Sequence, residues 1–229
     1  MLLEVIATTV GDAIAAERAG ADRLELVTGM KEGGLTPSAG LIEGTVRSVK
    51  IPSAVMVRPH SKSFVYDADD VRAMRRDIRL IRETGAAGIV IGTLTPQNEI
   101  DVPVLEALLE EAGGLEVVFH RAFDAVPDQI AAFRQLSGYK QITRILTSGG
   151  KPSALDAVDR MKELVELSRG SHITILAGSG LNAESLESFV KNTGVTEVHF
   201  GGAVRGPKGV EDDIAAEKIR EIRDILARC

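Results

Sequence analysis

Side chains that could do chemistry gather where one apolar run of the sequence ends. The run Val117–Phe119 is followed directly by His120 and Arg121, and Asp124 comes three residues later. An imidazole can act as a general acid or base, a guanidinium can hold an anion, and a carboxylate can orient either group. The pattern therefore predicts a binding or catalytic site at this position. The alternative is a strand that leaves the core for solvent, with a local bond between His120 and Asp124 at a helix start.

Other apolar runs also end in polar residues or in glycines. Arg58 ends the run at 54–58. Thr147 ends the run at 143–147, and Ser148 follows it directly. Glycine-rich segments follow the last two runs, and glycine lets backbone N–H groups come close to an anion. We therefore predict an anion site made by Arg58, Arg121, Thr147, Ser148, Gly178, Gly180, Gly201 and Gly202. Tight turns between strands and helices are the simpler explanation of the glycines.

Three more ionisable residues lie inside apolar runs, where a charge needs a partner. They are Glu4, Glu25 and His199, in the first, second and last runs. If these runs are neighbouring strands of a closed barrel, the three side chains can share one wall of its interior. One interpretation is a structural ion-pair network, with Arg58 or Arg144 as the cation. The other is a site for a hard cation, or an acid–base site built on carboxylate and imidazole.

The elements that must position these residues alternate regularly along the chain. We expect strands near 2–6, 23–27, 54–58, 88–92, 115–120, 143–147, 173–177 and 197–200. Several are almost entirely apolar, as in parallel strands that are covered on both faces. Amphipathic periods between them predict helices at 10–19, 39–49, 68–84, 102–112, 128–137, 153–168, 183–193 and 212–227. Asp67, Asp101 and Asn182 are suitable N-caps for three of these helices.

A short repeat supports this alternation. The segments GADRLEL (20–26), GAAGIVI (85–91) and GVTEVHF (194–200) each begin with a glycine that ends a helix and continue into a strand. Eight strand-then-helix units in 229 residues favour a single (β/α)8 barrel of the TIM type, which typically takes about 250 residues. In that fold the chemistry lies at the C-terminal ends of the strands. A doubly wound open sheet is the competing architecture.

Composition excludes several classes of function. The formal net charge of −6 disfavours nucleic acid as the partner, because such proteins need a clustered basic face. The chain contains no apolar run near the roughly 18 residues of a membrane span. Cys229 is the one cysteine, so neither a disulfide framework nor a CxxC metal site is possible. These features lead us to expect a cytoplasmic protein without a membrane partner.

Several segments in a fixed order resemble the CutC family, which is described as copper-homeostasis proteins. They are ADRLEL (21–26), EGGLTPSAGLI (32–42), VMVRP (55–59), FVYDADDVRAMRRDI (64–78), TLTPQNEID (93–101), FHRAFD (119–124), RILTSGG (144–150) and GSGLN (178–182). The resemblance covers nearly the whole chain. It implies a (β/α)8-type barrel, a cytoplasmic location and a homo-oligomer. It also implies copper binding, attributed in the family to sites that bear cysteine.

The chain departs from the family at those cysteines. Family members often carry them in the first two strands, where this chain has Ile6 and Val27. Copper(I) prefers thiolate and thioether ligands, and Cys229 follows the last predicted helix at the chain end. Histidines, among them His60, His120 and His199, are the remaining side chains that could bind copper(II) or another divalent ion.

Three functions follow as hypotheses. The first is a copper-homeostasis protein that binds the metal itself. The second is an enzyme, of the lyase or isomerase kind, that transfers a proton on a small anionic or phosphorylated metabolite. Here His120 would be the acid or base, Glu25 or Asp124 would orient it, and Arg58 and Arg121 would hold the anion. The third is a binding or regulatory barrel that uses the same pocket without turnover.

Overall fold

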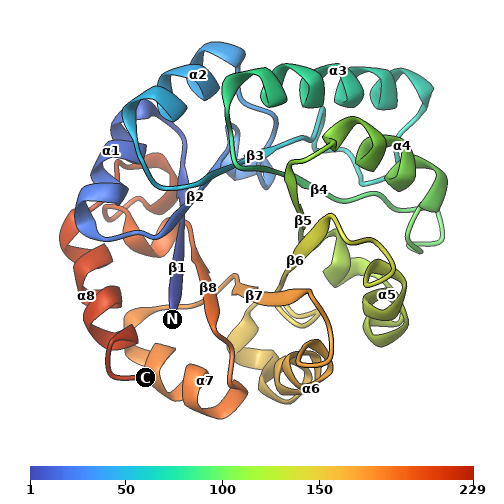
Figure 1. Ribbon diagram of the computed structural model, residues 1–229. Coiled ribbons are helices and arrows are strands. Elements are labelled where there is room, and N and C mark those ends of the chain that lie inside the picture. Colours follow the sequence, from blue (N-terminus) through green and yellow to red (C-terminus); the bar gives the residue numbers. More distant parts are fainter.

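The computed structural model describes residues 1–229, and its eight strands close into one parallel barrel. Figure 1 looks along the barrel, with the strands in the centre and the helices around them. The strands are β1 (Leu2–Ala7), β2 (Arg23–Leu26), β3 (Ser53–Met56), β4 (Gly88–Ile91), β5 (Glu116–Phe119), β6 (Ile142–Thr147), β7 (Thr174–Gly178) and β8 (Glu197–Phe200). Because β1 pairs with both β2 and β8, the (β/α)8 prediction is confirmed and the open-sheet alternative is wrong.

Eight α-helices return the chain from each strand to the next. They are α1 (Val10–Ala19), α2 (Ala39–Ser48), α3 (Ala68–Thr84), α4 (Val102–Ala112), α5 (Gln129–Leu136), α6 (Val158–Ser168), α7 (Ala183–Thr193) and α8 (Ala216–Leu226). The predicted N-caps Asp67, Asp101 and Asn182 each accept a hydrogen bond from a backbone N–H of the first turn. The helix-ending glycines Gly20 and Gly85 have φ of 104° and 84°, a region that other residues rarely adopt.

Two helices begin later than predicted, because the loops before them contain short 3-10 turns. Helix α6 begins at Val158, because residues Ala154–Ala157 form a separate turn, η3. Helix α8 begins at Ala216 rather than 212, because β8 leads into two short turns, η4 (Gly202–Val204) and η5 (Gly209–Glu211). These departures leave long loops at the C-terminal ends of β6 and β8, where loops of a barrel carry function.

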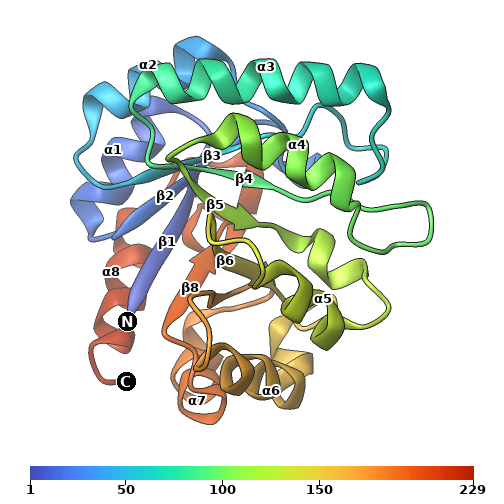
Figure 2. The ribbon, with the colours of Figure 1, turned by 45° about the vertical axis from the view of Figure 1, so that its right-hand side comes forward.

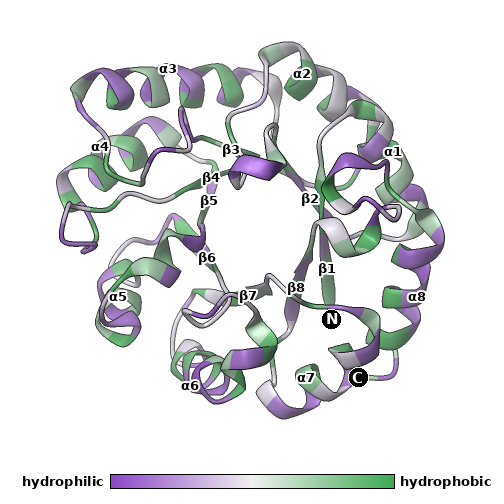
Figure 3. Ribbon diagram, turned by 180° about the vertical axis from the view of Figure 1, so that it is seen from behind, coloured by the Kyte–Doolittle hydropathy of each residue, from purple (hydrophilic) through white to green (hydrophobic).

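Two apolar clusters hold the barrel together. The larger one, of 54 buried residues, lies between the sheet and the helices, and the smaller one lies inside the barrel. The inner cluster is Val27, Ala54, Met56, Val90, Val118, Leu146 and Leu176. Figure 3 shows hydrophobic and hydrophilic residues alternating along the outer helices, as helices with one face on the sheet require. No helix is long and apolar enough to cross a membrane.

Charged side chains fill the N-terminal half of the barrel interior. Arg23 binds Glu4 and Glu197, and Arg144 binds Glu197 and Glu116. The Arg23 Nη2 to Glu197 Oε2 distance is 2.6 Å, and the Arg144 Nε to Glu197 Oε2 distance is 2.9 Å. The chain termini meet beside this end, as Figure 2 also shows, with Arg223 of α8 donating to the Met1 carbonyl. The barrel is therefore sealed by ion pairs at its N-terminal end.

Candidate functional site

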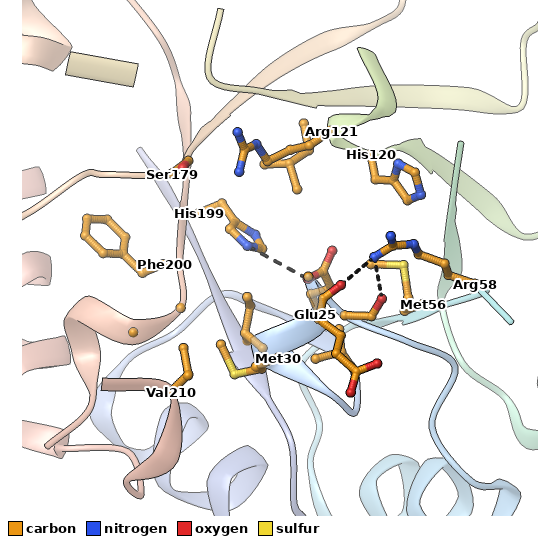
Figure 4. A pocket seen from close by; sticks show the side chains of 18 of the residues that line it. Glu25, Met30, Met56, Arg58, His120, Arg121, Ser179, His199, Phe200 and Val210 are labelled. Atoms are coloured by element: carbon orange, nitrogen blue, oxygen red, sulfur yellow. Dashed lines mark hydrogen bonds and ion pairs between the residues drawn. The ribbon is translucent and has the colours of Figure 1, made fainter. Parts of the chain in front are cut away.

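A cavity of about 750 Å³ opens at the C-terminal ends of the strands. Strand residues reach it because alternate side chains of each strand point inward. Figure 4 shows the labelled side chains around it, which come from strands and loops far apart in the sequence. Those used below are Ile6, Glu25, Val27, Met30, Met56, Arg58, Phe64, His120, Arg121, His199 and the loop segments 179–181 and 201–203. The site thus occupies the mouth predicted from the strand ends.

Glu25, His199 and Glu4 form a line of contacts on one wall of this cavity. His199 Nδ1 lies 2.7 Å from Glu4 Oε1, and His199 Nε2 lies 3.8 Å from Glu25 Oε2. Figure 4 marks the contact between His199 and Glu25. Glu4 lies deeper, where Arg23 holds its other oxygen, and all four residues are buried. The structure therefore brings together the three polar residues that the sequence placed inside the barrel.

The two carboxyl groups of this line differ strongly in acidity. Burial, reinforced by the negative charge of Glu4, raises the pKa of Glu25 to about 7 although the charge of His199 opposes the shift. For Glu4, burial is outweighed by the charge of Arg23 and the hydrogen bond with His199, which lower its pKa to about 2. For His199, burial is outweighed by Glu25 and Glu4, so its pKa is raised. Glu25 is thus the carboxyl group that can exchange a proton near neutral pH.

His120 offers a hydrogen-bond donor that no group of the protein uses. Its Nδ1 accepts the backbone N–H of Ala122 at 3.0 Å, so the proton of the neutral ring is on Nε2. Nε2 is buried and has no partner in the protein. Burial, with the nearby positive charge of Arg58, lowers the pKa of His120 to about 3. The ring can therefore donate to a ligand oxygen, whereas acting as a base would require it to give up the bond from Ala122.

Arg58 carries a buried positive charge with no carboxylate in ion-pair range. Its Nη1 donates to the carbonyl oxygens of Glu32 and Gly34 at 2.9 and 3.2 Å, and its guanidinium lies 4.8 Å from the centre of the Phe64 ring. Figure 4 shows the side chain on the same wall as His120. Because carbonyl dipoles do not neutralise a charge, Arg58 remains a buried cation without a countercharge.

Asp124 lies outside the cavity and organises the loop after β6. Its carboxylate accepts hydrogen bonds from Thr147 Oγ1, the backbone N–H groups of Ser148 and Gly150, and Ser148 Oγ, and it pairs with Arg121 Nε at 2.8 Å. It makes no hydrogen bond to His120. Thr147 and Ser148 are fully buried and donate to Asp124, and neither lines the cavity. The structure therefore gives these three residues a loop-holding position and keeps Arg121 at the cavity.

Of the four predicted glycines, three line the cavity and Gly178 does not. A side chain at Gly178 would come within 2.7 Å of Leu146, and one at Gly180, whose φ is 75°, within 2.1 Å of Ser153 Oγ. At Gly201 the nearest atoms would be those of Ile6 and Met30. Packing within the protein is thus a sufficient reason for glycine at Gly178 and Gly180, without a bound ligand.

Sequence reasoning missed several residues of the site and of its support. Arg23, and not Arg58 or Arg144, is the cation that binds Glu4, and Arg144 binds Glu197 instead. The signal was available in the spacing, because Arg23 and Glu25 lie two apart in one strand and so face the same side. Met30 and Met56 also line the cavity, but isolated methionines carry no sequence signal. His60 lies outside the cavity, with Nε2 3.1 Å from Asp70.

The donor atoms do not form the thiolate site that the family resemblance implies for copper. Ile6 and Val27 line the cavity where the cysteines would stand, and Cys229 is exposed at the chain end. Glu4, Glu25 and His199 each offer a ligand atom within 4.8 Å of the others, a set that suits a divalent ion better than copper(I). An ion there would have to displace the proton of His199 beside the charge of Arg23. The soft ligands of the cavity are the thioethers of Met30 and Met56.

Comparison with known proteins places the chain within one family. The model of the CutC family matches residues 1–204. A family protein CutC from Pasteurella multocida is 43% identical over 202 residues, 88% of this chain and 82% of that protein. A human protein named copper homeostasis protein cutC homolog is 40% identical over 200 residues, 86% of this chain and 72% of that protein.

Solved structures agree. A crystal structure of CutC from Streptococcus agalactiae has a TM-score of 0.82 and 34% identity, covering 87% of this chain and 97% of that one. Phosphoribosylanthranilate isomerase from Thermotoga maritima has a TM-score of 0.62 at 12% identity, covers both chains in full and shows a shared fold only. The chain is a (β/α)8-barrel protein with a cavity at the C-terminal ends of its strands. It belongs to the CutC family.

Proposed function

We propose that the cavity is the active site of an enzyme that moves a proton on a small anionic metabolite bearing a carbonyl or hydroxyl group. One observation carries the proposal: Glu25 Oε1 and His120 Nε2 line the same cavity, are buried and have no hydrogen-bond partner in the protein. Buried polar atoms are nearly always paired, so an acceptor and a donor left open in one cavity indicate a ligand that fills both.

The roles follow from the charges and protonation states. Ionised Glu25 accepts a proton from a carbon next to a carbonyl group, and the electron pair of the broken C–H bond moves onto the carbonyl oxygen. His120 donates its Nε2–H to that oxygen without transferring a proton, as a neutral imidazole can. The charge of Arg58 stabilises the negative oxygen in the same buried site. Return of the proton from Glu25 to the former carbonyl carbon, with transfer of the neighbouring hydroxyl proton to the enolate oxygen, completes an isomerisation.

Deuterium exchange tests this without knowledge of the true substrate. The protein would be incubated in D2O with a panel of hydroxyketones, keto acids and their phosphate esters, and the carbon-bound protons followed by proton NMR. We expect exchange into at least one compound that also raises the melting temperature. Glu25→Gln should abolish the exchange, because an amide cannot accept the proton. His120→Gln should slow it by about 100-fold, in the range of one lost oxyanion donor.

A matched control is Glu43→Gln, which alters an exposed carboxylate of α2 that pairs with Arg47 and should leave exchange unchanged. A compound that binds at Arg58 and His120 without any exchange would contradict an enzyme. It would favour instead the third hypothesis, a binding barrel without turnover.

A role in copper homeostasis is the second candidate, and the name of the human relative favours it. In this chain Met30, Met56 and His199 would be the ligands available to copper(I) inside the cavity. An anaerobic copper(I) competition titration would compare the wild type with Cys229→Ser and with Met30→Leu/Met56→Leu. Tight stoichiometric binding that survives Cys229→Ser and is lost in the double variant supports this role. Binding that disappears with Cys229 alone contradicts it.

The cytoplasm remains the location we propose. It is supported by cysteine usage, since Cys229 is free and exposed and the chain has no second cysteine with which to pair. Fractionation of cells that express the chain with an epitope tag would test it, and recovery from a membrane or secreted fraction would contradict it.

A further inference from the structure

Two loops beside the proposed active site present backbone N–H groups that the protein leaves unused. After β7 these are the N–H groups of Ser179, Gly180 and Leu181, and after β8 they are those at 201–203. All six belong to residues that line the cavity, and none has an acceptor within the protein. Leu181 is buried, Gly180 and Ala203 are exposed, and the other three residues are half-buried, so water meets most of these donors when no ligand is bound. Free donors in successive residues make a concave site for anions.

Arg121 brings a positive charge to the same side of the cavity. Its Nε and Nη2 are held by Asp124 and by Ser148 Oγ at 3.1 Å, while Nη1 has no partner in the protein. In Figure 4 the guanidinium is directed toward Ser179 and away from His120. Ser179 is fixed in turn by its Oγ, which donates to the Pro152 carbonyl at 2.8 Å. The charge and the loop are thus held by one connected segment, 148–153, so their relative position is set by the protein.

The opposite wall holds the groups that would meet the rest of the ligand. His120 is 4% exposed, and its unpartnered Nε2 faces the same cavity as the two loops. Arg58, 6% exposed, lies beside it without a carboxylate partner. A ligand that satisfies both walls must have a multidentate anion at one end and an oxygen-bearing carbon at the other. A phosphate monoester has three terminal oxygens and up to two negative charges, which suits six N–H donors and a guanidinium better than a planar carboxylate does.

We infer that the loops after β7 and β8, with Arg121, form a phosphate-binding subsite, and that the ligand of the cavity is a phosphorylated hydroxycarbonyl compound. The second half of this inference rests on the proposed function, because Glu25 and His120 would act on the unphosphorylated end. The subsite itself stands on the free donors alone and can be tested separately.

The test measures binding of inorganic phosphate to the full-length protein by calorimetry, together with phosphoglycolate and its unphosphorylated counterpart glycolate. We expect saturable phosphate binding and at least a hundredfold tighter binding of phosphoglycolate than of glycolate. Ala203→Pro removes one free N–H near the start of η4 without breaking a bond within the protein, and it should weaken phosphate binding about tenfold. Ala203→Ser keeps the N–H and should bind as the wild type does.

Arg121→Gln should likewise weaken phosphate binding about tenfold. It provides a second test if circular dichroism shows that Ala203→Pro does not fold. Phosphate binding that neither variant changes, or equal binding of phosphoglycolate and glycolate, would overturn the subsite. Glu25→Gln separates the two proposals, because it should stop proton exchange and leave phosphate binding intact. Exchange on an unphosphorylated compound with no phosphate binding would refute this inference and keep the proposed function.

Discussion

Glu25 sits where a carboxyl group is least stable in its ionised form. Its side chain is buried, Oε1 has no partner, and Arg23 of the same strand is taken by Glu4 and Glu197. The folded protein therefore binds the proton of Glu25 more tightly than the unfolded chain does, with a pKa of about 7 against an ordinary value of 4.5. An enzyme that keeps a base of this kind accepts a loss of stability when the base ionises.

The first prediction concerns that loss. Since the folded-state pKa is raised, the stabilisation is complete below about pH 4.5 and disappears as the pH rises to about 7. At pH 8 the free energy of unfolding of Glu25→Gln, measured in urea, should therefore exceed that of the wild type by roughly 3 kcal/mol. At pH 5 the two free energies should be nearly equal. The exposed Glu32→Gln serves as control and should change little at either pH. A variant less stable than the wild type at pH 8 would show that His199 stabilises ionised Glu25 by more than burial costs.

The second prediction concerns the pH dependence of proton exchange. If ionised Glu25 is the base, the exchange rate should rise with pH through about 7. The charge of His199 lowers the pKa of Glu25, so His199→Gln should move the midpoint of the rise to higher pH. The measurement is the NMR exchange rate between pH 5 and pH 9 for both proteins. An unchanged midpoint in His199→Gln would mean that another group sets the profile.

At the scale of elements, the loop after β6 depends on a single carboxylate from the loop after β5. Asp124 receives bonds from Thr147, Ser148 and Gly150, and it orients Arg121. The sequence predicted that Asp124 would orient His120, whereas the structure shows it bound to Arg121 and to the loop after β6. Its effect on any chemistry passes through the position of Arg121 and of the segment 148–153.

The third prediction follows from these bonds. Asp124→Ala leaves several donors without an acceptor and should cost about 2–4 kcal/mol of unfolding free energy. Asp128→Ala, which removes only the N-cap of α5, should cost about 1 kcal/mol. Urea unfolding of both variants compares them. Equal costs would mean that the loop after β6 is held by other contacts.

Element patterns predicted the barrel well and the site partly. Strand and helix positions follow from local apolar periods, and the ends of eight such strands must meet at one mouth. Which charges pair across the barrel is set by register, and Glu4 faces both Arg23 and His199 because β1 pairs with β2 and β8. No single-strand pattern contains that information. The free backbone N–H groups of the loops could not be predicted either, because the sequence does not show which N–H groups lack a hydrogen-bond acceptor in the fold.

At the scale of the molecule, the ion pairs at the floor of the barrel join strands that are distant in sequence. Glu197 of β8 accepts from Arg23 of β2 and Arg144 of β6, and Arg144 also reaches Glu116 of β5. Buried charges of this kind stabilise little as pairs, but removal of one member leaves the others uncompensated.

The fourth prediction tests this network. Glu197→Gln should destabilise the protein by about 3–5 kcal/mol in urea unfolding, because Arg23 is 4% exposed and loses a carboxylate. Glu187→Gln removes an exposed pair with Lys191 on α7 and should change the stability little. A small effect at Glu197 would show that water reaches the barrel floor.

The fifth prediction is self-association, which the family resemblance implies. The surface limits its form, because Met1, 39% exposed, is the one large hydrophobic side chain that stands well out into solvent. An interface between copies should therefore be largely polar and sensitive to salt. Sedimentation velocity at micromolar concentration, in low and high salt, measures it. A monomer under both conditions would contradict the prediction.

The sealed floor has a kinetic consequence. Below the cavity lie the apolar inner cluster and then the ion pairs, so the interior of the barrel offers no passage to the opposite face. Whatever enters the cavity at the C-terminal ends of the strands must leave by the same side. A departing product therefore occupies the route of the next substrate. For the reaction proposed above, an analogue of the product should raise KM and leave kcat unchanged.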